Sequence, residues 1–308
     1  MGNKIFIPPY IINDVNPILP FSQVIDWGIE KLDIQKIHKI GITGKGVKVG
    51  VVDSGCFLKH QDLNIASSKD FTNTSPEDTS GHGTHVAGII AAKDNSLGIL
   101  GVAPDVELHI YKALDGEYGS LDSITKALKA AIEDGMDIIN MSLGTPTHAK
   151  SLESLCKKAK EKGIVIVAAS GNTGQEQKFY PASYDSCISV GAIDKLFEVA
   201  DFTTHNEQLD VVAPGSKILS THLKGKYAIL SGTSMAAPFV SGCLALMKQA
   251  GIELTYENIT KSTIDILSTG FDKRSGYGII DPKIALNFPK EEKKVSCFKK
   301  FFNKLLHI

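Results

Sequence analysis

Four apolar segments of this chain begin or end in a small group of polar residues, and this feature constrains the fold most. The segment GTSMAAP (232–238) leads from a serine turn into an apolar stretch with helical spacing, 239–247. GHGTHVAG (81–88) opens a second apolar helix, while VVDSG (51–55) and AASGN (168–172) end apolar runs. Polar groups at such ends are expected at one edge of a buried sheet, where ligands of α/β proteins bind.

Short apolar runs alternate with helical patterns along the chain. The runs that predict buried strands are residues 47–53, 107–113, 137–142, 163–169 and 187–192. Residues 120–134 and 151–162 carry apolar side chains at helical spacing, and Gly135 and Gly163 follow them as stops. This alternation predicts an α/β fold with a central, mostly parallel sheet and helices on both faces.

Composition indicates one ordinary globular domain. The chain has 308 residues, of which 43% are hydrophobic and 22% charged, enough for one large core. We find no repeat and no linker rich in Pro, Gly or Ser between the polar segments. The formal net charge of −1 gives no electrostatic basis for binding nucleic acid, so no nucleic-acid partner is expected.

Cysteine usage and the amino terminus predict a cytoplasmic protein. The first ten residues, MGNKIFIPPY, lack the apolar region of a secretory signal, and no apolar run approaches the ~20 residues that span a bilayer. The five cysteines are scattered and odd in number, which favours reduced thiols. They form no CxxC or Cys/His cluster that would indicate zinc.

The four polar segments together resemble the subtilisin-like serine proteases (the subtilase family), and in particular the bacterial intracellular subtilisins. The order Asp53, His82, Asn172, Ser234 is that of the family, and the resemblance runs from about residue 25 to about residue 282. It implies the three-layer subtilisin fold and a serine endopeptidase. In an α/β-hydrolase the serine would precede the histidine, so the order excludes that class.

The resemblance also implies a role for each of the four residues. A serine hydroxyl is a weak nucleophile unless a base takes its proton, and His82 would be that base for Ser234. Asp53 would orient the imidazole, and Asn172 would donate its amide to the oxyanion. His85 competes for the role of base, but in the family the first histidine of HGTH is catalytic. The alternatives are a dedicated processing protease for a peptide precursor and a catalytically silent binding module.

The family binds peptide substrates as an added strand. By resemblance, one wall of the groove is expected at Ser142, Leu143 and Gly144. The other wall is expected at Gly119, Ser120 and Leu121. The specificity pocket would be lined by Ala169, Ser170 and Gly171. Phe179 departs from the family, which commonly has a small or polar residue there. Its ring would either shorten the pocket and favour small side chains before the scissile bond, or turn outward without effect.

A structural calcium site is also implied by resemblance. Calcium prefers carboxylate, amide and carbonyl oxygens. Side chains of Gln23, Asp62 and Asn95 match the family's ligands, and backbone carbonyls of Lys93, Leu97 and Ile99 would complete the shell. The alternative is a turn without a metal.

Both ends of the chain extend past the expected peptidase domain, residues 21–289. Residues 1–20 contain Ile7, Pro8, Pro9 and Tyr10, similar to an element that lies across the active cleft of intracellular subtilisins. We expect an inhibitory extension that is later cleaved between about residues 13 and 22, or else a purely structural arm. Residues 290–308 have the pattern of a basic amphipathic helix, which could contact a membrane, its own domain or a dimer partner. The resemblance further implies a homodimer.

Overall fold

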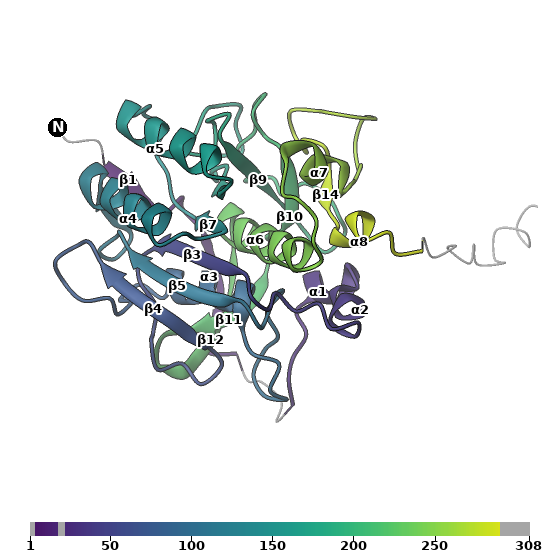
Figure 1. Cartoon of the computed structure of the whole chain (residues 1–308), viewed down its shortest axis with the longest axis horizontal. Helices are drawn as coiled ribbons and strands as arrows, with labels where there is room; N and C mark the ends of the chain where they lie inside the picture. The colour runs from purple at the N-terminus through teal and green to yellow at the C-terminus, as the bar shows by residue number, and fades with distance from the viewer. Residues whose placement is uncertain (1–3, 18–21, 290–308) are drawn as a thin grey trace, which may run out of the picture.

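The computed structural model describes residues 4–17 and 22–289. Within them, a nine-stranded sheet has the strand order β13-β14-β10-β9-β8-β7-β3-β5-β4 (Figure 1). All neighbours pair in parallel except β13 and β14. The strands are β3 (Lys48–Asp53), β4 (Ile65–Asp70), β5 (Glu107–Lys112), β7 (Ile138–Met141), β8 (Val165–Ala169), β9 (Cys187–Ile193), β10 (Val211–Pro214), β13 (Thr263–Ile264) and β14 (Ile279–Ile280). The predicted, mostly parallel sheet is therefore confirmed.

Helices cover both faces of this sheet. Helices α3 (His82–Ala91) and α6 (Thr233–Gln249) pack on one face, and α4 (Leu121–Glu133) and α5 (Lys150–Glu161) on the other. Neighbouring strand residues face opposite layers, so Val51 packs with the first pair of helices and Val52 with the second. Since both faces are covered, the central strands are continuously apolar, which is why the sequence revealed them.

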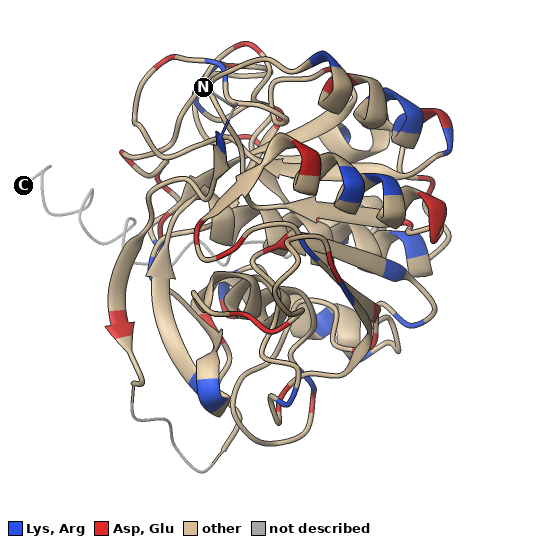
Figure 2. Ribbon diagram, turned by 90° about the vertical axis from the view of Figure 1, so that its left-hand side faces the viewer, with Lys and Arg blue, Asp and Glu red and all other residues tan. Residues whose placement is uncertain are grey.

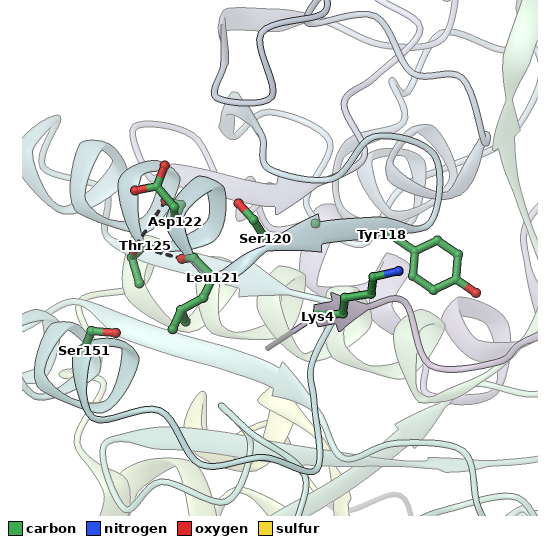
Figure 3. A pocket seen from close by; sticks show the side chains of 8 residues that line it. Lys4, Tyr118, Ser120, Leu121, Asp122, Thr125 and Ser151 are labelled. Atoms are coloured by element: carbon green, nitrogen blue, oxygen red, sulfur yellow. Dashed lines mark hydrogen bonds between the residues drawn. The ribbon is translucent and has the colours of Figure 1, made fainter. Parts of the chain in front are cut away.

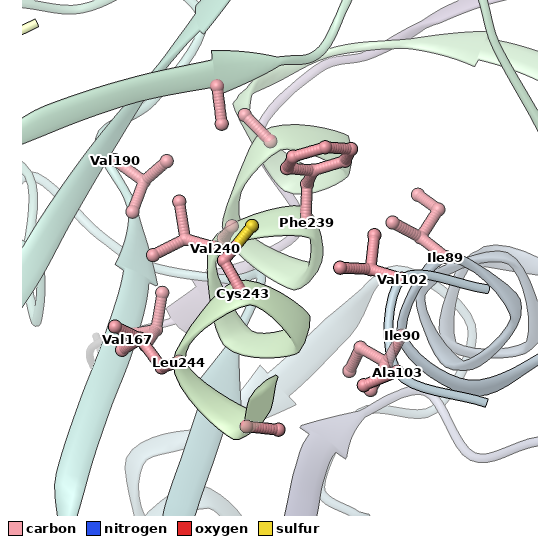
Figure 4. Packing of buried hydrophobic residues seen from close by; sticks show 14 of the residues in the cluster. Ile89, Ile90, Val102, Ala103, Val167, Val190, Phe239, Val240, Cys243 and Leu244 are labelled. Atoms are coloured by element: carbon pink, nitrogen blue, oxygen red, sulfur yellow. The ribbon is translucent and has the colours of Figure 1, made fainter. Parts of the chain in front are cut away.

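Helix α6 is buried from Thr233 to Met247. Figure 4 shows its apolar side chains between the strands that carry Val167 and Val190 and the helix that carries Ile89 and Ile90. A helix enclosed in this way has little freedom to shift. Residues at its amino-terminal end are therefore held firmly relative to the sheet.

Two small sheets lie outside the main one, and the sequence did not predict them. Strand β1 (Lys4–Phe6) pairs antiparallel with β6 (Tyr118–Ser120). Strand β2 (Ile11–Val15) pairs with β12 (Lys226–Ser231), which also pairs with β11 (Ile218–His222). The amino-terminal extension thus contributes one strand to each small sheet. The remaining short elements are α1 (Trp27–Lys31), α2 (Ile34–His38), the 3-10 helix Leu223–Gly225, α7 (Tyr256–Lys261) and α8 (Pro282–Ala285).

Charged residues of both signs are interspersed over the ribbon in Figure 2, in keeping with the small net charge. Of the helices in the described ranges, none has the length and apolar character needed to cross a bilayer. Cys56, Cys156, Cys187 and Cys243 are buried free thiols. The predicted amphipathic tail, 290–308, lies outside the described residues.

Candidate active site

Asp53 and His82 meet at the carboxyl end of the central strand β3. Asp53 is the last residue of β3, and His82 is the first residue of α3. The Nδ1 atom of His82 lies 2.8 Å from Oδ1 of Asp53, and both side chains are fully buried. A carboxylate can only accept, so Nδ1 carries the proton and Nε2 is left as an acceptor. In the described structure Nε2 has no hydrogen-bond partner.

A second buried carboxylate, which the sequence analysis missed, fixes the start of α3. The Asp78 side chain accepts hydrogen bonds from Ser54, Ser80, Gly81 and Thr84. It thereby ties the end of β3 to the first turn of the helix that carries His82, where free N–H groups favour an anion. The available signal was an acidic residue four positions before His82.

Ser234 is the second residue of α6 and is completely buried. Its Oγ atom donates to the carbonyl of Ser142 at 3.2 Å, and Oγ of Ser142 donates to the carbonyl of Ser234 at 2.9 Å. Pro238, four residues further along, has no N–H to bond that carbonyl. The proline thus frees the Ser234 carbonyl for the residue that follows strand β7.

Asn172 lies in the loop after β8, where its side-chain amide bonds Thr233 through the oxygen and Pro9 through the nitrogen. Its Oδ1 atom accepts from the backbone N–H and the hydroxyl of Thr233, each at 2.8 Å. This leaves Nδ2 as a donor, and it bonds the carbonyl oxygen of Pro9 at 2.9 Å. Asn172 and the turn before Ser234 are therefore adjacent, and a backbone carbonyl lies against the amide.

The extension runs as an extended chain through the groove between the two predicted walls. On one side β1 pairs with β6, and on the other Phe6 and Gly144 exchange two backbone hydrogen bonds of 2.9 and 3.0 Å. The ring of Tyr10 lies 5.2 Å from the imidazole of His82, measured between centroids. Its hydroxyl donates to a carboxylate oxygen of Glu117 at 3.2 Å. The extension therefore covers the imidazole and isolates it from solvent.

The ring of Phe179 points inward, toward the predicted specificity pocket. A Cβ atom at Gly144 would lie 2.4 Å from the ring, and one at Gly171 would lie 3.2 Å from it. Phe179 is only 3% exposed, and the ring of Phe6 packs edge-on against it at 5.8 Å. Of the two orientations open from sequence, the structure has the inward one, which reduces the space between Gly144 and Gly171. Ala169, Ser170 and Gly171 are buried beside it.

Comparison with known proteins identifies the family. The subtilase family model matches residues 44–278. Subtilisin BL of Lederbergia lenta is 41% identical over 271 residues, covering 86% of this chain and 99% of its own length. The major intracellular serine protease of Bacillus subtilis is 39% identical over 279 residues, covering 86% of each chain. The thermostable alkaline protease of Halalkalibacterium halodurans is 41% identical over 266 residues, covering 85% of this chain and 73% of that protein. This chain belongs to the subtilase family. It is accordingly a subtilisin-like serine endopeptidase, a hydrolase.

In this subtilase the groove continues into an open pocket beside the outer end of β1. Figure 3 shows residues that line it, among them Lys4, Tyr118, Ser120, Leu121, Asp122 and Ser151. The predicted wall at Gly119 and Ser120 is thus a strand that pairs with the extension, and Leu121 already begins α4.

His85, the competing base, is a structural residue in this subtilase. Its Nε2 atom lies 3.2 Å from the carbonyl of Ile218 and 3.0 Å from that of Ala228, which links α3 to strands β11 and β12. Complete burial lowers the pKa of His85 from 6.5 to about 3, so the imidazole stays neutral. The two histidines of the HGTH segment therefore differ in their partners: His82 bonds the carboxylate of Asp53, whereas His85 contacts backbone carbonyls.

The six predicted calcium ligands lie around one loop. The Gln23 amide contacts the carbonyls of Lys93 and Ile99 at 2.7 and 3.0 Å. Asp62 accepts from the Asn95 side chain at 2.9 Å and from the N–H of Ile99 at 2.8 Å. The loop also contains Leu97, whose N–H bonds the Asn95 side chain. Among the described residues no group of three His, Cys, Asp or Glu could hold a metal, so any ion at this loop would depend on amide and carbonyl oxygens besides the single carboxylate of Asp62.

Proposed function

We propose that this subtilase hydrolyses peptide bonds with Ser234 as nucleophile, His82 as general base, Asp53 as the group that orients it and Asn172 as oxyanion donor. The observation that supports this most is the hydrogen bond from Asn172 to the Pro9 carbonyl. With Asn172 as the oxyanion donor, the Pro9 carbonyl stands where a substrate carbonyl would develop negative charge, which supports this assignment. The donor is held by Thr233 and needs no rearrangement.

The reaction follows from this arrangement. Ser234 Oγ leaves the Ser142 carbonyl, passes its proton to Nε2 of His82 and bonds the substrate carbonyl carbon. The oxyanion is held by Asn172. His82 then returns the proton to the departing amine as the C–N bond breaks, which leaves an acyl-enzyme. Water, deprotonated by His82, attacks the ester, and Ser234 recovers its proton.

Covalent labelling by a fluorophosphonate tests this assignment. Once the extension is displaced, we expect one label per chain, and none in Ser234→Ala. Ser241→Ala is the matched control, because Ser241 is a buried hydroxyl of the same helix bonded to Asn140 and Ala237. Equal labelling of all three proteins would refute the role of Ser234, and an unlabelled but folded chain would favour a silent binding module.

We further propose that the extension keeps the enzyme latent until it is removed. Three observations support latency: the extension fills the groove, Tyr10 covers His82, and Ser234 Oγ is bonded to Ser142 rather than engaged with the Pro9 carbonyl. Proline at positions 8 and 9 removes two N–H groups that a substrate strand would offer. The intact chain would therefore be bound in its own groove without being cleaved efficiently.

Latency is tested on the full chain with residues 17–21 replaced by the recognition site of a specific protease. This chain is folded intact and then cut, and the released segment is removed by gel filtration. If the open state of the intact chain is about 1% populated, cutting raises the rate of peptide hydrolysis about a hundredfold. Equal rates before and after the cut would identify the extension as a structural arm.

A structural calcium ion at the loop of Asp62 and Asn95 is also part of the proposal. One carboxylate, two side-chain amides and three backbone carbonyls form a set of hard oxygen donors that suits calcium better than zinc or copper. The ion would crosslink the start of the domain at Gln23 to the loop after α3, and so would act on stability rather than on the chemical step.

We propose an intracellular location and a homodimer as well. Support for the location comes from the relative named the major intracellular serine protease and from the free thiols of the four described cysteines. Dimerisation is checked by sedimentation of the purified chain, where a monomer at micromolar concentration would exclude it.

A further inference from the structure

One edge of strand β12 has no role in the proposed catalytic reaction. One side of β12 pairs with β11, and its other side pairs with β2 of the extension. The contact begins at Ser231, three residues before Ser234, and ends at Tyr227, whose carbonyl accepts the N–H of Asn16 at 2.8 Å. Figure 2 shows the two strands side by side at the margin of the molecule.

This pairing is continuous with the catalytic groove. The Pro9 carbonyl lies on Asn172, so Tyr10 occupies the first position after the bond that faces the amide. Counting onward, Ile11 is the second residue, paired with Ser231, and Asn16 is the seventh. A single extended chain thus occupies the groove and the β12 edge together, far beyond the residues that flank the scissile bond.

The edge recognises the backbone rather than particular side chains. All five residues of β2 are exposed, and Ile11, Ile12 and Val15 are each at least half exposed. In the described structure one side-chain hydrogen bond joins β2 to β12, from Ser231 Oγ to the side chain of Asn13. Once the extension leaves, the N–H and C=O groups on this side of β12 lose their partners and can pair with another strand.

We propose that β12 docks the part of a protein substrate that follows the scissile bond, out to about its seventh residue. The ligand is an extended polypeptide of broad sequence, without proline at the positions whose N–H faces β12. This rests on the proposed function, because it names the substrate of the same site. The enzyme would therefore prefer unfolded protein segments to short peptides that end soon after the cleaved bond.

Peptides of different length test the docking edge on the chain that was folded intact and then cut. All share one bond chosen from a digest of denatured casein, followed by either three or seven residues. Since two or more backbone hydrogen bonds are added, we expect the longer peptide to have a kcat/KM roughly tenfold higher. Equal values would overturn the proposal.

Methylation of single substrate amides locates the contact. In antiparallel strands, N–H groups of alternate residues face the partner. Since the N–H of Asn16 bonds Tyr227, N-methylation at the seventh position should clearly reduce the advantage of the long peptide. Methylation at the sixth, equivalent to Val15, should preserve it. Equal effects at both positions would contradict β12 pairing, whereas failure of every peptide to be cleaved would instead contradict the proposed function.

Discussion

The side-chain amide of Asn172 donates a hydrogen bond to the carbonyl oxygen of Pro9, across 2.9 Å. Pro9 belongs to the extension, and Asn172 follows the central strand β8. Their contact places a peptide carbonyl of this chain against an amide beyond the end of the sheet, and it identifies Pro9–Tyr10 as the bond of the extension that faces the proposed catalytic residues.

Replacing Asn172 by Ala should lower kcat and leave KM nearly unchanged, because the amide would act on the oxyanion more than on the ground-state carbonyl. The expected loss, ~10²–10³ in kcat, is the value known for the equivalent amide of a subtilisin and is adopted from it. Steady-state kinetics of the cut enzyme measure it. A rise in KM alone would show that Asn172 only binds substrate.

Tyr10→Ala should raise the activity of the intact, uncut chain, because the ring over His82 is lost. Tyr10→Phe is the matched control, since it keeps the ring and removes only the hydrogen bond to Glu117. That bond lies at an exposed position and contributes about 1 kcal/mol or less. The readout is the initial rate of peptide hydrolysis before cutting. Equal activation by both substitutions would show that the hydroxyl of Tyr10, and not its ring, keeps the intact chain inactive.

Phe179→Ala should enlarge the pocket between Gly144 and Gly171. We expect the cut enzyme to gain kcat/KM for substrates with a large apolar side chain before the scissile bond, and to change little for those with alanine there. The substitution removes a buried ring, so the free energy of unfolding should fall by about 3 kcal/mol. Competition between peptides that differ at this position provides the measurement, and an unchanged ratio would show that the ring does not limit the pocket.

Chelation should lower the melting temperature of the chain if the loop around Asp62 binds calcium. Saturation at a hundredfold excess over Kd stabilises a protein by about 2.7 kcal/mol. Asp62→Asn should melt lower in calcium and show almost no response to chelator. Asp94→Asn, in the same loop but outside the predicted ligand set, should keep the response. Identical melting of the original chain with and without chelator would remove calcium from the account.

His85, which is fully buried, and Asp26, which is partly buried, should shape the acid stability of the chain in opposite directions. Burial lowers the pKa of His85 to about 3, so the unfolded state alone binds that proton as the pH falls below 6.5, and stability is lost by up to about 1.4 kcal/mol per pH unit. Burial raises the pKa of Asp26 from 3.8 to about 6, so between these values the folded state binds the extra proton and gains stability.

Urea unfolding between pH 7 and pH 4 therefore separates the two groups. His85→Gln should flatten the loss of stability toward acid, because a neutral amide that cannot titrate replaces the imidazole. Asp26→Asn should make the loss steeper, because the compensating proton uptake is gone. If instead His85→Gln steepened the loss of unfolding free energy toward acid and Asp26→Asn flattened it, other groups would control the stability of the chain at low pH.

Central elements were predictable from sequence because they are buried on both faces. The run at 47–53 became β3, and 120–134 contains α4, since continuous apolarity and helical spacing reflect burial directly. Because this apolar run ends at Asp53, the sequence also predicted that Asp53 lies at the edge of the sheet. By contrast, β2 is exposed along its whole length and has no apolar alternation. Its pairing with β12 depends on a free edge more than 200 residues away, which no local pattern encodes.

The orientation of Phe179 needed coordinates for a similar reason. An aromatic residue in a loop can face inward only if its neighbours leave room, and Gly144 and Gly171 provide that room without side chains of their own. Asp78 was missed because an acidic residue near a helix start is common. Only the hydrogen bonds to it show that it positions the helix of His82.

The extension and the groove it fills belong to one covalent chain, and this has a kinetic consequence. A short tether holds a segment near its site at an effective concentration on the order of millimolar. After a single break in the tether, the same segment is diluted to the concentration of the protein itself, about a thousandfold lower in a micromolar solution. One hydrolytic event would thus turn a permanent occupant into an ordinary dissociating peptide, and dilution would make that change irreversible.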